Sequence, residues 1–134
     1  MFKLIKILNS GVNVPENVKL PKSTSLEVKM GSALTLAGGS VANCGASAAP
    51  TYIAAQNAAA GESSVLCYAV SGNMLFETTV SAAPAALKIG DKVTLGTDAD
   101  GAAVNVTATT TSGVATVIDL AGAKNAGDKI TVKF

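Results

Sequence analysis

The sequence predicts an all-β protein with one small body, built as a barrel or a sandwich of short strands. Alanine, valine, threonine and glycine dominate the chain. β-Branched residues favour strands, and small residues suit tight turns and close sheet packing. Short stretches of alternating apolar and polar residues recur, separated by turn-forming residues. A chain of 134 residues is one domain by default and can bury its own core.

The start of the chain predicts an extended N-terminal arm over residues 1–24, in front of a compact body over residues 25–134. Residues 1–30 carry five lysines against two glutamates. Pro15 and Pro21 interrupt helices and central strands alike, so this part is expected to be extended, with a short strand at its tip.

The body is expected to contain strands wherever the period-two alternation is clear. These segments are 25–30, 92–95, 104–109, 114–120 and 129–134. Residues 64–80 are predicted to form a hairpin around the turn Ser71–Gly72–Asn73. Helix signals are weak: the alanine-rich stretch 53–61 could form a turn or two, so we expect at most one or two short helices.

The side-chain inventory excludes several chemistries. The chain has no histidine, and all ten basic residues are lysine. Ser-His-Asp sites, histidine zinc sites and bidentate arginine recognition of phosphate are therefore impossible. A net charge of +1 gives no reason to expect nucleic acid as a partner. Cys44 and Cys67 are expected to be apolar core thiols, with a disulfide between them left open.

The segment Gly90–Gly101, GDKVTLGTDADG, suggests a calcium loop but fails the test. Aligning Gly101 with the invariant glycine of an EF-hand loop places Asp98 and Asp100 correctly. Gly96 and Thr107 then stand where two essential ligands are needed. A phosphate loop fails too, because alanines follow Gly101. We expect a turn here, and no metal, cofactor-binding or catalytic residue anywhere in the chain.

The opening MFKLIKIL is the strongest candidate for contact with a partner. Its dense apolar residues are flanked by lysines. It could be the first strand of the body, or a segment that adds to a partner's sheet edge. The basic stretch behind it favours the partner. The candidate interaction residues are Phe2, Lys3, Leu4, Ile5, Lys6, Ile7, Leu8, Lys19 and Lys22.

The same opening is not expected to be a signal peptide. Lys3 and Lys6 interrupt its short apolar run, and no small-residue cleavage site closes it. No segment approaches the ~20 apolar residues that span a bilayer, so no membrane partner is expected. We expect the protein to be made in a cytoplasm.

Several segments, in their order and spacing, carry a resemblance over essentially the whole chain. They are LIKI and NVPE (4–7 and 13–16), GSALTL (31–36), CGASAAPTYIA (44–54), MLFETTV (74–80), LKIGDKVTLGTD (87–98), TATTTSGVATVIDL (107–120) and GDKITVKF (127–134). With these segments the sequence resembles the capsid decoration, or cement, proteins of tailed bacteriophages.

The resemblance implies a structural role in the virion. Such proteins bind the outer face of an expanded shell of major capsid protein and clamp neighbouring subunits together. It implies a β-tulip-like body, an N-terminal arm that joins a capsid-protein sheet, and a homotrimer made in the bacterial host. It supplies no catalytic residue and no cofactor. The alternatives are a head fibre base, a tail β-barrel protein, or a carbohydrate- or ligand-binding β module.

Overall fold

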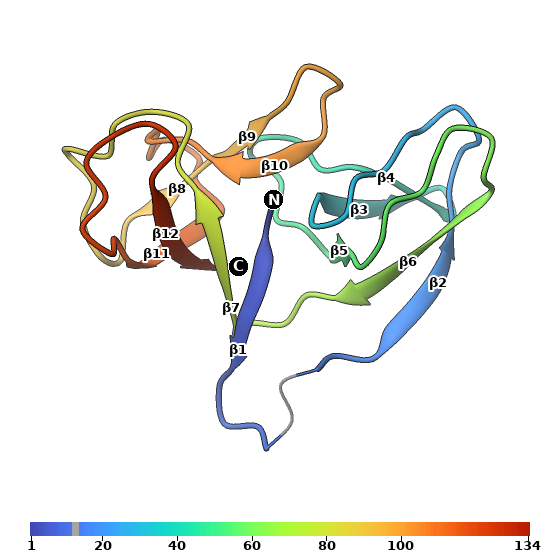
Figure 1. Ribbon diagram of the computed structural model, residues 1–134, viewed down its shortest axis with the longest axis horizontal. Coiled ribbons are helices and arrows are strands. Elements are labelled where there is room, and N and C mark those ends of the chain that lie inside the picture. The colour runs from blue at the N-terminus through green and yellow to red at the C-terminus, as the bar shows by residue number, and fades with distance from the viewer. Residues whose placement is uncertain (12–13) are drawn as a thin grey trace.

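The computed structural model describes residues 1–11 and 14–134, and their secondary structure is entirely β (Figure 1). The all-β prediction is confirmed. The strands are β1 (Lys3–Ile7), β2 (Asn17–Pro21), β3 (Ala33–Ala37), β4 (Ser40–Asn43), β5 (Tyr52–Ala54), β6 (Ser64–Ala69), β7 (Met74–Thr79), β8 (Lys92–Val93), β9 (Leu95–Thr97), β10 (Ala103–Val106), β11 (Ala115–Asp119) and β12 (Lys129–Lys133).

The strands form two antiparallel sheets that are not closed into a barrel. The first sheet has five strands in the order β1-β7-β12-β11-β8. The second has seven, in the order β2-β6-β5-β3-β10-β9, with β4 paired to β3. In Figure 1, β11 and β12 lie at the left and β2 and β6 at the right, while β1 and β7 run through the middle. Of the two predicted arrangements, the observed one is the open pair of sheets.

The main core lies between the sheets, and a smaller one lies within the second sheet. The main core takes Phe76 and Val132 from the first sheet and Ile53 and Leu95 from the second, all at most 1% exposed. The smaller core contains Leu34, Val41, Val65 and Cys67. A bridge between Lys22 and Val41 curls the second sheet around it.

The predicted hairpin over 64–80 is wrong, because its two halves belong to different sheets. β6 pairs with β2 and β5, whereas β7 pairs with β1 and β12. The turn at 71–73 therefore carries the chain from one sheet to the other. Turn residues fix where a chain changes direction, but both strands are central and take their partners from distant segments.

The predicted strand over 92–95 is divided between the sheets. β8 pairs with β11 in the first sheet, and β9 pairs with β10 in the second. Val93, Thr94 and Leu95 are all buried. Consecutive side chains of one strand point to opposite faces. Because the chain crosses between the sheets at Thr94, the side chains on either side of it can both be buried.

Two further segments differ from what their sequences suggested. No regular strand forms over 25–30: Val28 makes a single bridge to Ala58, with N–O distances of 2.8 and 2.9 Å. Residues 53–61, which the sequence allowed to form a helical turn or two, contain no helix, and Ile53 and Ala54 belong to β5. Pairing with distant backbone here overrides the helix preference of alanine. The alternation over 129–134 is confirmed, with Ile130 and Val132 buried.

Candidate interaction surface between two sheet edges

The segment predicted as an arm supplies an edge strand to each sheet. β1 lies at one edge of the first sheet, where Leu4 pairs with Phe76 of β7. β2 lies at one edge of the second, where Asn17 pairs with Tyr68 of β6. Edge strands retain backbone groups that can pair with another chain. Residue 13 of the NVPE segment, and positions 12–13 of the predicted arm, lie outside the described residues.

The apolar candidates of β1 pack mostly on this chain's own body. Phe2 is 2% exposed, and its ring meets Phe134 edge-on at 5.3 Å between centroids. Leu4 and Ile7 pack against the same core, and Leu8, half-buried, donates its N–H to the Asn73 carbonyl at 2.7 Å.

Ile5 is the exception. The β1–β7 register shifts between Leu4 and Lys6, and the Ile5 side chain is 46% exposed. A strand within the body, the first of the two alternatives, is therefore what the free chain contains. Pairing of this segment with a partner stays a prediction.

The lysine candidates divide into two kinds. Lys22 is 4% exposed, and its Nζ donates to the carbonyl oxygens of Leu26, Ala59 and Ser23 at 2.7, 2.9 and 3.3 Å. It therefore holds together two loops of its own chain. Lys3, Lys6 and Lys19 are exposed and remain accessible to a partner.

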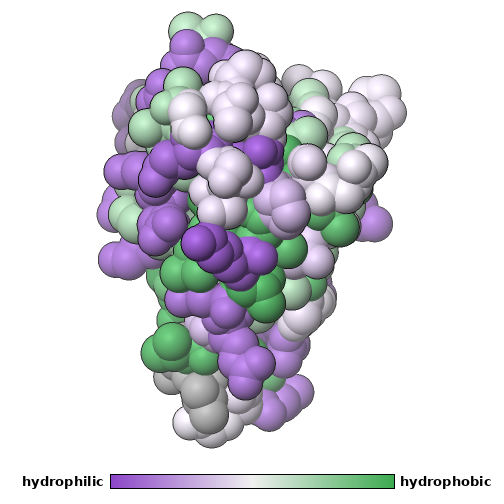
Figure 2. Space-filling view, turned by 90° about the vertical axis from the view of Figure 1, so that its right-hand side faces the viewer, coloured by the Kyte–Doolittle hydropathy of each residue, from purple (hydrophilic) through white to green (hydrophobic). Residues whose placement is uncertain are grey.

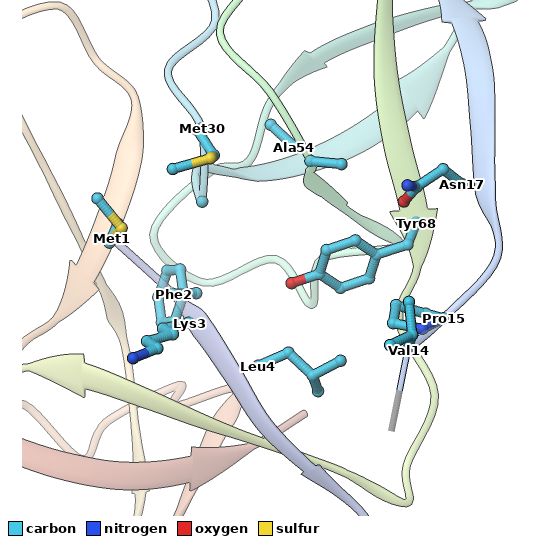
Figure 3. Close-up of a pocket in the computed structure, with 12 residues that line it drawn as sticks. Met1, Phe2, Lys3, Leu4, Val14, Pro15, Asn17, Met30, Ala54 and Tyr68 are labelled. Atoms are coloured by element: carbon cyan, nitrogen blue, oxygen red, sulfur yellow. The ribbon is translucent and has the colours of Figure 1, made fainter. Parts of the chain in front are cut away.

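A groove of about 300 Å³ lies between β1 and the β2–β6 edge (Figure 3). Figure 3 shows Phe2 and Leu4 on one side, Tyr68, Val14 and Pro15 on the other, and Met1 and Met30 at one end. We call it the inter-sheet groove; its lining is Met1, Phe2, Lys3, Leu4, Val14, Pro15, Asn17, Met30, Gly31, Ala54, Ala55 and Tyr68. Most of these side chains are apolar.

Three exposed apolar side chains, Met1, Val14 and Met30, line this groove. Among the described residues, seven large hydrophobic side chains are exposed, and five of them belong to residues 1–30: Met1, Ile5, Val14, Val18 and Met30. Figure 2, which views the β2 side, shows apolar residues interleaved with hydrophilic ones. Exposed apolar side chains that cluster at a hollow are typical of surfaces that bind partners or ligands. Sequence reasoning found β1 but missed Tyr68 of β6 and Met30 of the loop before β3, which come near β1 only in the folded chain.

A lysine forms ion pairs with both aspartates of the DADG turn. The Lys29 ammonium lies 2.8 Å from one carboxylate oxygen each of Asp98 and Asp100. The hydrogen bond from Lys29 lowers the pKa of Asp98, as do the backbone N–H groups of Ala102 and Asp100. The predicted turn is confirmed, with Gly101 at a φ of 78°. No group of three or more potential metal ligands occurs in the described part of the chain.

The two cysteines are free and buried. Burial raises the pKa of Cys67 to about 11 and also raises that of Cys44. The sequence left a disulfide between them open, but the two thiols belong to different cores and are not bonded to each other. The described residues contain no helix able to span a bilayer.

The fold and the surface define an all-β protein of two antiparallel sheets, with an apolar groove where their edges meet. This chain is similar in fold to the head fibre gp8.5 N base of bacteriophage phi29, with a TM-score of 0.54 and 17% identity. The match covers 89% of this chain and 94% of that one. No protein-family model and no curated protein matches the sequence.

Proposed function

We propose that this protein is a non-enzymatic structural component of a bacteriophage virion, which binds the outer capsid surface and stabilises contacts between major capsid protein subunits. The observation that carries the proposal is the fold shared over 89% of the chain with a phage head fibre base. The sequence resemblance to decoration proteins points to the same class of protein. The absence of histidine and arginine from the sequence agrees with a role that needs no reactive side chain.

The surface supplies what such a role requires. Two edge strands offer backbone pairing, and exposed lysines on β1 and β2 suit an acidic partner surface. Many modest contacts, repeated over a closed symmetric shell, give strong binding without one strong site. A homotrimer would multiply these contacts further.

A head fibre base is the second candidate, favoured by the same fold likeness. The two roles differ in number and attachment. A protein that clamps neighbouring subunits should occupy the equivalent positions of the shell, whereas a fibre base should carry a projecting fibre. An image reconstruction of the purified particle separates them, because it shows both the positions and any density projecting from them.

Co-sedimentation with expanded capsids and with immature shells tests the proposal. We expect the full chain to bind expanded capsids and not immature shells. Deleting residues 1–20 is a poor test, because it removes β1 and most of β2 from the two sheets. Ile5→Glu and Lys6→Glu change exposed side chains of β1 and leave its core residues in place. If the unaltered chain binds neither particle, the proposed function is wrong.

A further inference from the structure

The Tyr68 side chain is largely buried, and its hydroxyl faces the inter-sheet groove. Tyr68 is 8% exposed, and its hydroxyl points from β6 toward β1 (Figure 3). Among the described residues it has no hydrogen-bond partner. Tyrosine hydroxyls that become enclosed usually find a partner, and a ligand that covers this groove is placed to supply one. Burial raises the pKa of Tyr68 to about 12, so the hydroxyl keeps its proton and can donate.

The walls of the groove suit an apolar side chain. Leu4, Val14 and Met30 line it, and Val14 is 75% exposed at its mouth. Methionine is unbranched and polarizable, so it adapts to side chains of different shape. A volume of about 300 Å³ is at the lower end of the range for binding pockets and accommodates side chains rather than a large cofactor.

Two lysines lie at or beside the groove. Lys3 lines it, and Lys19 lies on the same face of β2 as Asn17, two residues away. Glu77, which faces Lys3 across β1 and β7, already accepts a hydrogen bond from Lys129 at 2.8 Å. Glu16, next to the start of β2, is the other nearby acid in the sequence. Neither Lys3 nor Lys19 takes part in an ion pair within the described residues.

We propose that the inter-sheet groove binds an extended, acidic segment of another protein, which inserts one apolar side chain between Leu4 and Met30. A backbone carbonyl of that segment accepts the hydrogen bond from Tyr68, and its carboxylates lie near Lys3 and Lys19. The inference rests on the proposed function only for the source of the segment, a protein of the virion surface. A small apolar molecule could contact the apolar walls of the groove but would make no interaction with the lysines.

The full chain is tested against an array of short overlapping peptides that covers the virion's proteins. We expect bound peptides to combine an apolar residue with Asp or Glu. Val14→Glu places a carboxylate at the mouth and should weaken binding by roughly tenfold or more. Lys19→Glu should weaken it by a similar factor and reduce its dependence on salt. Tyr68→Phe removes only the hydroxyl and should cost roughly fivefold.

Ile89→Glu is the matched control. Ile89 is 69% exposed, does not line the inter-sheet groove, and should change nothing when charged. The proposal is overturned if no peptide binds, or if Val14→Glu and Lys19→Glu bind peptides as the unaltered chain does. It is also overturned if an apolar fluorescent dye occupies the groove and the bound peptides do not displace it.

Capsid binding, measured in parallel, separates this inference from the proposed function. If the Val14→Glu and Lys19→Glu variants bind capsids as well as the unaltered chain does, and no peptide binds at the groove, the inference is wrong and the proposed function stands. Groove-dependent peptide binding without any capsid binding supports the inference and removes the proposed function.

Discussion

The Lys29 ammonium lies 2.8 Å from the Asp98 carboxylate, although the two residues are 69 positions apart. This contact joins the loop after β2 to the β9–β10 turn, and Asp100 completes the pair of acceptors. In the folded chain the two carboxylates that suggested a calcium loop are paired with an ammonium group of the chain itself.

Replacing Lys29 with methionine should lower stability at neutral pH and make less difference in acid. The folded-state pKa of Asp98 is lowered, so its contribution is present above its unfolded pKa and is lost as the pH falls through the folded value. Thermal unfolding of both proteins between about pH 7 and pH 2 measures the difference. Lys124→Met, at an exposed lysine without an ion pair in the described chain, is the control. A difference that persists unchanged at the acid end contradicts the assignment.

Phe2→Ala should destabilise the free chain by about 3–4 kcal/mol, because a ring at 2% exposure leaves a cavity in the core. Ile5→Ala, on the same strand, should cost less than about 1 kcal/mol because its side chain is largely in solvent. Urea unfolding at equilibrium measures both. If Phe2→Ala is as mild as Ile5→Ala, β1 is not part of the folded body in solution and the arm interpretation gains support.

Lys22→Met should cost about 2–3 kcal/mol. The substitution keeps the length of the side chain and removes the donor to three carbonyl oxygens. Buried carbonyls without a partner are costly, and hydrogen bonds from a charged donor are among the stronger ones. Lys19→Met, on the exposed side of β2, should stay within about 0.5 kcal/mol in the same urea titration. Equal effects of the two substitutions would contradict the buried position of Lys22.

Gly113→Ala should prevent folding or cost at least about 3 kcal/mol. A methyl group at this position would lie 2.1 Å from the Lys92 carbonyl oxygen and 2.2 Å from its carbon, so backbone must move. Gly11→Ala is the control, because nothing lies within 4 Å of the added atom. Circular dichroism and thermal unfolding compare the two. A folded Gly113→Ala protein of unchanged stability would mean that β8 and the 112–114 turn are not in contact.

Much of the local structure could be predicted from the sequence, because it depends on nearby residues. The alternation of Ile130 and Val132 identifies β12, and the Asp98–Gly101 turn follows from its own side-chain hydrogen bonds to the backbone. The strand at the start of the chain was also expected, although its partner was left open.

The partners of the strands could not be predicted, since they depend on distant segments. Nothing near Ser71 or Thr94 in the sequence indicates that the chain changes sheets there. For the same reason the groove was missed. Tyr68 comes near Leu4 only because β6 and β1 border the same gap, and no alternation within either strand contains that information.

The position of β12 has a consequence for the order of events during synthesis. It lies between β7 and β11, so the first sheet lacks a central strand until β12 has been made. Until then β7 can pair with β1 on one side only. Topologies rich in pairings between distant segments fold slowly. A chain that stops before β12 should therefore be unable to form the inter-sheet groove, so binding to any partner there would require β12 to have been made and paired.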